Sequence, residues 1–540
     1  MAVETCDALI IGGGHNGLVC AAYLAGAGLR VRVLERRPIV GGAAVTEEFV
    51  PGFRNSTASY TVSLLNPKVI RDLRLHAHGL RVVERPYANF LPLPDGRSFR
   101  LGGEQTQAEV ARWSTRDAQR LPEYYAMLDR VVLVLRELMV RTPPNVSDAF
   151  VMADWLSSLD VGRRLKHLDM RGRRDLLDLF TKSAGELLDA WFESAPLKAV
   201  LGWDSVVGNF ASPYTPGSAY VLLHHVFGEV NGKSGVWGHA IGGMGAITEA
   251  IAKECAARGV AIETNAGVAQ VLVENGKAVG ARLSDGREIR AKSVVSNINP
   301  KLLYQTLVAR EHLDTDVAER IDRYRCGSGT FRMNVALSEL PDFTAAPGTQ
   351  QQPHHQSGIL IGPSLAYFEQ AYFDAKSREY NAGWSRQPIV EVVISSTLDD
   401  TLAPQGQHVA SLFCQHVNPV MDGNGGWDAH RDTVANLMID TVDAYAPNFR
   451  RSVLGYKALS PLDLEREYGL VGGDIFHGSL GLDQLFSARP ILGQGNYRGA
   501  LKGLYLCGSG THPGGGVTGL PGRNAAREIL VDLKRKPRPD

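Results

Sequence analysis

The first 35 residues constrain the fold more than any other part of this 540-residue chain. Ala8–Ile11 is a short apolar run of the kind expected for a buried parallel strand. Gly12, Gly14 and Gly17 follow with the spacing G-x-G-x-x-G, and then come a helical pattern and a second strand that ends at Glu35. This order of strand, glycine loop, helix, strand and acid predicts a dinucleotide-binding α/β unit.

Each residue of the motif has a physical task in such a unit. Gly12 permits the tight turn, Gly14 lets the backbone approach a pyrophosphate, and Gly17 lets the helix pack on the strand. The free N–H groups at the start of the helix favour the phosphates. Glu35 is placed to accept hydrogen bonds from ribose hydroxyls. NAD and FAD both suit this unit, so the motif alone does not choose between them.

A second glycine turn just downstream favours FAD. Gly41 and Gly42 follow the acid, and Ala43 comes next. NAD-binding domains usually continue into an ordinary helix at this point, whereas a second glycine turn lets the backbone run beside the diphosphate and ring system of a flavin. We therefore assign Gly42 and Ala43 to the cofactor site. Arg36 is expected either beside the adenosine of FAD or in solvent.

The Glu-Arg pair before Gly-Gly resembles the pattern of glutathione reductase-like flavoproteins, in particular the phytoene desaturase and amine oxidase branches. Later stretches such as "GGMGA", "SNINP" and "GSGTHPGGGVTG" follow the desaturase-like order. The resemblance implies an α/β protein with a Rossmann-type FAD-binding domain and an interleaved α+β substrate domain. It also implies that the backbone around Val268 lies beside the adenine side of FAD.

The carboxy-terminal stretch "LYLCGSGTHPGGGVTGLPGRNAAREIL" contains a second G-x-G-x-x-G at Gly514, Gly516 and Gly519. A nucleotide-binding loop would begin at the end of its strand, and its helix would start inside the motif. This motif begins several residues after the strand ends, so we interpret the spacing as accidental. In the desaturase-type family this loop passes under the isoalloxazine ring and aims the helix start at its pyrimidine end. The resemblance thus implies cofactor contacts by Gly508, Ser509, Gly516, Val517 and Thr518. Ser509 stands where many related flavoproteins carry an aspartate.

The chain divides into alternating blocks. Blocks with glycine-rich strand and helix patterns are typical of a nucleotide-binding domain, and a block with apolar residues at helical spacing is typical of a cap. Strand-like runs such as "TFRMNVAL" predict a sheet that forms the floor of a substrate cavity. We predict FAD-binding parts at 1–105, 237–300 and 490–540, a helical cap at 106–236, and a second substrate part at 301–489.

Composition excludes several classes of protein. The chain has 57 Lys and Arg residues and 57 Asp and Glu residues, so it carries no large net charge that would attract nucleic acid. No apolar run reaches the length of a membrane span, and the early strand leaves no room for a leader, so we expect a cytoplasmic protein. The six cysteines form no close pair. This argues against a zinc cluster or a redox dithiol, and we predict no metal site.

A flavin without a redox dithiol or an NADPH domain most naturally takes a hydride from a C–H or C–N bond. We expect a desaturase- or oxidase-type reaction on an apolar small molecule, with oxygen or a quinone accepting the electrons. Two alternatives stay open, namely an amine oxidase-like or redox-neutral isomerase, and a flavin-bearing interaction protein.

Candidate catalytic residues are few. His239 and His512 are the catalytic candidates, and Tyr60 is a further candidate for facing the substrate. For His224 and His225, packing or helix capping is the preferred interpretation. Carotenoid desaturases of this family act at membranes, so a peripheral membrane contact stays open, although no amphipathic anchor with a basic face stands out. No oligomeric state is indicated.

Overall fold

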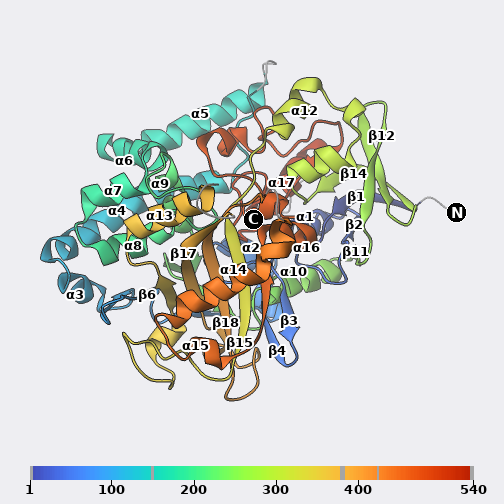
Figure 1. The fold of residues 1–540 in the computed structure, drawn as a ribbon. Coiled ribbons are helices and arrows are strands. Elements are labelled where there is room, and N and C mark those ends of the chain that lie inside the picture. The colour runs from blue at the N-terminus through green and yellow to red at the C-terminus, as the bar shows by residue number, and fades with distance from the viewer. Residues whose placement is uncertain (1–3, 147–150, 378–382, 422–424, 535–540) are drawn as a thin grey trace.

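The computed structural model describes residues 4–146, 151–377, 383–421 and 425–534. Across the molecule a helical layer comes first, then the sheet that contains β15 (Thr330–Leu337) and β18 (His408–Val417), and then the sheet that contains β1 (Glu4–Ile11) and β14 (Glu288–Ser296) (Figure 1). Within the described residues, no helix is long and apolar enough to cross a bilayer. In the same residues, no group of three or more His, Cys, Asp or Glu side chains is arranged to hold a metal ion.

The first sheet gathers strands from three distant parts of the chain. Its order is β11-β2-β1-β14-β13-β12, and β20 also pairs with β14. Strands β1, β2, β11 and β20 run parallel to their neighbours, as the buried apolar runs predict. The strands are β1 (Glu4–Ile11), β2 (Val31–Leu34), β11 (Ala261–Glu263), β12 (Val268–Glu274), β13 (Lys277–Leu283), β14 (Glu288–Ser296) and β20 (Leu504–Leu506).

Strand β14 lies in the middle of the first sheet. It runs without a break from Glu288 to Ser296. Its first half pairs antiparallel with β13, and its second half pairs in parallel with β20 while β1 runs along its other edge. Strand β14 therefore joins the parallel part of the sheet to its antiparallel part.

The second sheet has the order β19-β15-β18-β17-β16-β6-β7. Two of its strands, β6 and β7, come from the block predicted to belong to the first nucleotide part, so that block also supplies the substrate side. The strands are β6 (Asn89–Pro92), β7 (Ser98–Leu101), β15 (Thr330–Leu337), β16 (Gly358–Ile361), β17 (Trp384–Val393), β18 (His408–Val417) and β19 (Val453–Leu459). Short pairs outside both sheets are β3 (Thr46–Val50) with β4 (Phe53–Ser56), β5 (Val82–Glu84) with β10 (Gly238–Ala240), and β8 (Glu229–Val230) with β9 (Lys233–Ser234).

Helices flank both sheets. The cap helices α4 and α6–α9 lie beside the second sheet, and α5 runs along their outer edge (Figure 1). The cap comprises α3 (Thr106–Ala111), α4 (Thr115–Met139), α5 (Met152–Lys166), α6 (Met170–Thr181), α7 (Ala184–Trp191), α8 (Ala195–Trp203) and α9 (Ser218–His225). The others are α1 (His15–Gly26), α2 (Pro67–Asp72), α10 (Gly245–Ala257), α11 (Pro300–Leu302), α12 (Thr315–Asp322), α13 (Leu365–Lys376), α14 (Gly426–Asp443), α15 (Phe449–Ser452), α16 (Pro461–Tyr468) and α17 (Leu520–Asp532).

Helix α17 ties the end of the chain to its beginning. It packs against α1, and an added Cβ at Gly522 would lie 2.1 Å from the backbone oxygen of Asn16. Only a glycine allows the two backbones to come this close. The loop before α17 is therefore held beside the glycine loop before α1.

Candidate cofactor cleft and active-site cavity

The first glycine loop forms one wall of a long cleft. Gly12 and Gly14 line the cleft, while Gly17 lies behind them, where an added Cβ would be 2.3 Å from the Gly12 carbonyl oxygen. An added Cβ at Gly14 would be 2.7 Å from Nδ2 of Asn297. Gly14 is the N-cap of α1 and offers no side-chain cap, so the first N–H groups of the helix are left for an anionic group.

Glu35 lies at one end of this glycine-lined cleft. Its Oε2 accepts a hydrogen bond from the Gly13 N–H at 2.8 Å, and its Oε1 accepts one from the Arg37 N–H at 2.9 Å. Both bonds fix the buried carboxylate in the wall, and its remaining lone pairs are available to hydroxyl groups. Val268, the first residue of β12, lies in the same wall.

Arg36 lines the same end of the cleft but is not simply solvated. Its guanidinium donates to the carbonyl oxygens of Arg466 and Glu467, each at 3.0 Å, in α16. It therefore joins α16 to the end of the cleft that Glu35 lines. The favourable placement of a cation near the carboxyl end of a helix strengthens this contact.

The second glycine turn touches the first. The Gly41 N–H donates to the Gly13 carbonyl oxygen at 2.9 Å, and an added Cβ at Gly42 would be 3.2 Å from the Gly14 Cα. Both turns thus present bare backbone along one stretch of the cleft. Ala43 follows at the point where the cleft meets a second cavity.

The carboxy-terminal loop closes the other side. Ser509 lines both the cleft and the second cavity, and its Oγ accepts a hydrogen bond from Asn16 Nδ2 at 3.1 Å. Gly516 and Val517 line the second cavity, with Val517 in the left-handed region at φ 58°. Such strain in a non-glycine residue persists only where the surrounding structure enforces it.

Two predicted contact residues lie just behind the walls. Gly508 packs against the backbone of Asn297, where an added Cβ would be 2.5 Å from the carbonyl oxygen. Thr518 Oγ1 accepts the N–H of Leu520, the first residue of α17, at 3.1 Å. Because α17 begins at Leu520, after the whole glycine triplet, the second G-x-G-x-x-G does not open a helix.

Arg489 anchors this loop, and sequence reasoning missed it. The side chain is fully buried, and its guanidinium donates to the carbonyl oxygens of Phe476, at 2.7 Å, and Ser509, at 3.0 Å. Further bonds run to the carbonyls of Gly478 and Gln484. The arginine thereby holds the terminal loop against the segment that carries Phe476.

The cleft continues into an inner cavity. His15, Ala43, His477 and Ser509 line both spaces. Much of the wall beyond them is apolar and comes from the cap, the second sheet and the segment before Arg489. These apolar residues are Leu64, Trp203, Val207, Trp237, Phe413, Leu470, Ile475 and Phe476.

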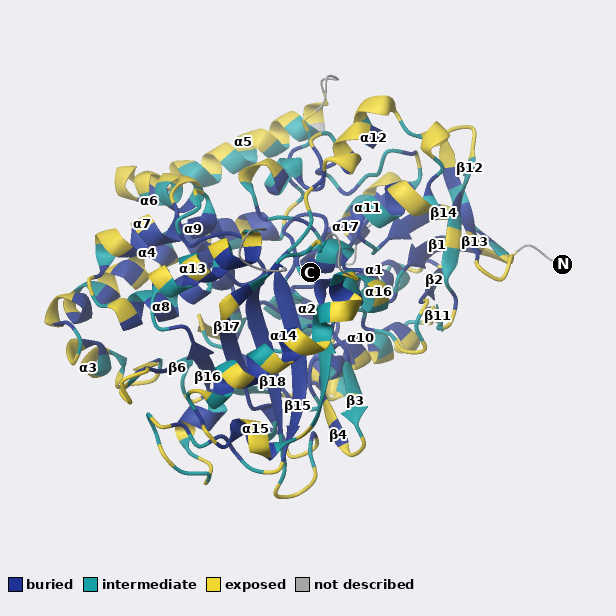
Figure 2. Cartoon of the chain, in the orientation of Figure 1, coloured by how far each residue is buried: buried dark blue, intermediate teal, exposed yellow. Residues whose placement is uncertain are grey.

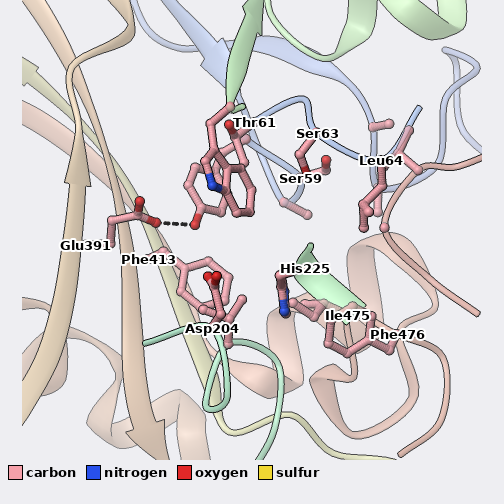
Figure 3. A pocket seen from close by; sticks show the side chains of 18 of the residues that line it. Ser59, Thr61, Ser63, Leu64, Asp204, His225, Glu391, Phe413, Ile475 and Phe476 are labelled. Atoms are coloured by element: carbon pink, nitrogen blue, oxygen red, sulfur yellow. Dashed lines mark hydrogen bonds between the residues drawn. The ribbon is translucent and has the colours of Figure 1, made fainter. Parts of the chain in front are cut away.

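One end of the inner cavity is polar (Figure 3). Tyr60 donates its hydroxyl hydrogen to the Glu391 carboxylate, and Arg85 lies 3.8 Å from the other oxygen of Glu391. Arg85 also donates to the Thr61 hydroxyl at 2.8 Å. Asp204, which follows α8, points into the same space. Burial and the charge of Glu391 raise the pKa of Asp204 to about 8, so this carboxyl is mostly protonated at neutral pH.

The predicted histidines occupy different places. His225 lines the inner cavity, donates through Nδ1 to the Val221 carbonyl oxygen at 2.9 Å, and stacks on Trp237. Burial lowers the pKa of His225 to about 4, which keeps the ring neutral. His224 is buried one residue earlier against Phe476.

Neither catalytic candidate lies in the wall of the inner cavity. His239 is buried with Nε2 3.0 Å from Asp399 Oδ2. His512 lines a different, apolar cavity beneath the cap, with Nε2 3.2 Å from the Leu138 carbonyl oxygen. Burial lowers the pKa of His512 to about 4. A catalytic role for either residue stays a prediction.

Comparison with known proteins identifies the family. Residues 17–331 match the model of the flavin containing amine oxidoreductases. Pyridine nucleotide-disulfide oxidoreductase domain-containing protein 2 of Rattus norvegicus is 43% identical over 549 aligned positions, covering 98% of this chain and 94% of the relative. The chain belongs to the flavin-containing amine oxidoreductase family. It is thus an FAD-dependent oxidoreductase.

Further similarities agree with this assignment. The phytoene desaturase (lycopene-forming) of Pantoea ananas is 24% identical, covering 97% of this chain and 99% of the relative. The structure of cyclohexylamine oxidase from Brevibacterium oxydans shares the fold, with a TM-score of 0.57, 15% identity and coverage of 98% and 100%. The resemblance to desaturase-like flavoproteins is therefore confirmed, together with the amine oxidase-like FAD-binding fold.

The cleft fits FAD in this flavoprotein. Two glycine turns that touch through bare backbone, an uncapped helix start and an oriented glutamate suit the phosphates and ribose. His15 Nε2 is buried in the cleft wall without a hydrogen-bond partner among the described residues. Sequence reasoning did not assign Arg37, Asn297, Tyr468, Gly469 and His477, which also line the cleft. Asn297 lies in the quoted "SNINP", and this was the one available signal.

Proposed function

We propose that this flavoprotein removes a hydride from a C–H or C–N bond of a largely apolar small molecule, and that oxygen or a quinone then takes up the electrons. The observation that carries the proposal is the continuity between the cofactor cleft and the inner cavity. Ala43, Ser509, Gly516 and Val517 border the cavity on the cofactor side, and mostly apolar side chains form the rest. Such a cavity orients an apolar molecule and excludes water from it.

Bound FAD supplies the two-electron acceptor for this chemistry. The chain's own residues have positioning tasks. Glu35 and Val268 hold the adenosine end, and the glycine turns hold the diphosphate. The loop with Gly516 and Val517 faces the inner cavity, and the start of α17 follows it. Helix N–H groups there favour negative charge that develops on a neighbouring group.

The test is anaerobic mixing of the FAD-loaded protein with a panel of terpenes, alkyl alcohols and alkyl amines. We expect the visible flavin band to bleach with at least one apolar compound, and to return on addition of oxygen or a soluble quinone. Comparison of the two reoxidation rates identifies the acceptor. A flavin that dithionite reduces but no compound in the panel bleaches would argue against the proposal.

Two alternatives give different results in the same experiment. Turnover without net bleaching indicates a redox-neutral isomerase, and bleaching by amines alone indicates amine oxidation. A flavin that is inert to every compound and inaccessible to dithionite indicates an interaction protein. The fit of the inner cavity to a small molecule is the reason to prefer catalysis over the last of these.

We further propose that the protein acts in the cytoplasm and contacts the surface of an anionic membrane. The six cysteines are free thiols, as expected in a reducing compartment. Helix α5, which sequence analysis did not single out, exposes an apolar face at helical spacing along the outer edge of the cap (Figure 2). This face consists of Met152, Trp155, Leu156 and Leu159, each at least 41% exposed.

The charge next to this face supports the choice of an anionic surface. Arg163 and Lys166 are exposed in the last turn of α5, and Arg171 and Arg174 are exposed in the next helix. Basic residues beside an apolar helix face are typical of helices that lie in the membrane interface. The apolar side chains of α4, by contrast, are mostly buried. An apolar cavity of about 600 Å³ lies between α4, α5 and α6, and it would suit a substrate arriving from lipid.

A further inference from the structure

The polar end of the inner cavity contains a carboxyl group that the protein itself does not use. The Asp204 carboxyl forms no hydrogen bond with the residues that the structure describes, although it lies in a largely buried space. Buried polar groups in native proteins are nearly always hydrogen-bonded. An unpartnered carboxyl that points into a cavity therefore indicates a ligand that completes it.

The charges around Asp204 restrict what this ligand can be. Two guanidinium groups, those of Arg85 and Arg332, are buried beside the single carboxylate of Glu391. Arg332 lies 4.5 Å from the centre of the Tyr60 ring and donates to backbone carbonyls and a serine hydroxyl. Arg85 keeps Nε without a hydrogen-bond partner in the described structure. The end of the cavity is therefore net positive when Asp204 carries its proton.

We propose that Asp204 is a substrate-recognition residue, which donates a hydrogen bond to an oxygen atom of an otherwise apolar substrate. The substrate class would be an aliphatic or terpenoid molecule with one alcohol, carbonyl or carboxylate oxygen, and not an unsubstituted hydrocarbon. This inference rests on the proposed function, because it assigns the substrate of the same cavity. The apolar walls hold the hydrocarbon part, and Asp204 fixes its orientation.

An oxygen atom suits this end better than an ammonium group. An oxygen accepts from the Asp204 carboxyl and is attracted by the positive charge of Arg85 and Arg332, whereas an ammonium would be repelled by both. Asp204 also follows the carboxyl end of α8, where a negative charge is disfavoured. The titratable groups that face Asp204 are Glu391 of β17, His225 of α9, and Tyr124 and Tyr125 of α4. Burial lowers the pKa of His225 and raises the pKa of both tyrosines, so these three groups are neutral at neutral pH.

The test measures binding to the FAD-loaded protein with a matched series of probes. Octane, octanol, octanal, octanoate and octylamine share one chain and differ only at one end. Dissociation constants come from the perturbation of the oxidised flavin spectrum under anaerobic conditions. We expect at least one oxygen-bearing probe to bind about tenfold more tightly than octane, as one net hydrogen bond allows.

Two variants separate hydrogen bonding from packing. Asp204→Leu removes the donor and should erase the preference over octane, while Asp204→Asn retains a donor and should keep it. With octanal, which can accept a hydrogen bond but cannot donate one, the wild-type affinity should fall as the pH rises through about 8, because the carboxyl then loses its proton. Asp204→Asn should bind octanal equally at every pH. Asp129→Asn, at an exposed aspartate of α4, is the matched control.

Each outcome decides the question. Equal affinities for octane and for all three oxygen-bearing probes, or an unchanged preference in Asp204→Leu, would overturn the inference. Tightest binding of octylamine, lost in Asp204→Asn, would replace it with recognition of a cation. Because the readout is binding and not turnover, the inference can fail while hydride removal from another substrate is still observed. Conversely, the preference for oxygen-bearing probes can hold even if no compound bleaches the flavin.

Discussion

Replacement of Arg489 by methionine should destabilise the protein and release its flavin. The arginine is fully buried, and its guanidinium satisfies backbone carbonyls of the segment that carries Phe476 and of the terminal loop at Ser509. Methionine fills similar space but donates nothing. The carbonyls would be left buried without partners, and the nearby carboxyl of Asp474 would lose its cation.

The magnitude follows from these losses. A buried acceptor without a partner costs about 1–3 kcal/mol, and several carbonyls are affected, although such costs do not add fully. Removing one member of a buried charged network typically costs about 3–5 kcal/mol. We therefore expect a loss of about 4 kcal/mol in the free energy of unfolding. In a protein of this size this corresponds to a fall of roughly 4 °C in Tm, because the entropy of unfolding grows with chain length.

The assay combines thermal unfolding with the ratio of FAD to protein after purification. Arg489→Lys keeps the charge but reaches fewer carbonyls, so it should lie between the wild type and Arg489→Met. Arg323→Met is the control, because Arg323 is 75% exposed and pairs only at the surface. An Arg489→Met protein with unchanged Tm and full FAD content would refute the view that this side chain holds the terminal loop on the cofactor.

Three further perturbations test other parts of the structure. Gly14→Val should abolish FAD retention, because a branched side chain would enter the diphosphate stretch of the cleft; Gly162→Val, where an added Cβ meets nothing within 4 Å, should remain yellow. Asp399→Asn should destabilise the protein most above about pH 4. Burial alone would raise the pKa of Asp399, but hydrogen bonds from His239, Thr401 and the Gly242 N–H lower it to about 2. The stability that depends on ionised Asp399 is therefore present above the ordinary pKa and lost as the pH falls toward 2, which urea titrations at several pH values would measure. Changing both Trp155 and Leu156 of α5 to serine should weaken binding to anionic vesicles about tenfold or more in a sedimentation assay. Unchanged binding would contradict the proposed membrane face.

The sequence predicted the cofactor side of the molecule because local rules govern it. A glycine triplet between strand and helix and an acid at the next strand end each follow from backbone geometry within one short segment. The structure places Gly12, Gly14 and Glu35 in the wall of one cleft, and Val268, which the resemblance implied, lines the same cleft. Their contacts with FAD stay a prediction. The resemblance to known flavoproteins then supplied the terminal loop, which no local rule would have joined to the amino terminus.

The substrate side could not be read in the same way. Tyr60, Arg85, Asp204 and Glu391 come from four separate segments, and each has an ordinary sequence neighbourhood. Their relation exists only after the second sheet has formed and the cap has closed over it. The two catalytic histidine candidates were chosen for proximity to glycine motifs in sequence, and proximity in sequence did not place either in the wall of the inner cavity.

The two ends of the inner cavity therefore differ in the substitutions that they tolerate. The cofactor end is bounded by backbone that must stay bare, so substitutions there should abolish FAD binding whatever the substrate. The polar end is built from side chains on β17, just after α8, and in the segments around residues 60 and 85. The Asp204 carboxyl has no hydrogen-bond partner to lose among the described residues. A change at Asp204 can thus alter what the cavity recognises without disturbing the cofactor. If Asp204→Leu instead lost FAD or unfolded, the carboxyl would have a structural role, and the separation between the two ends would be wrong.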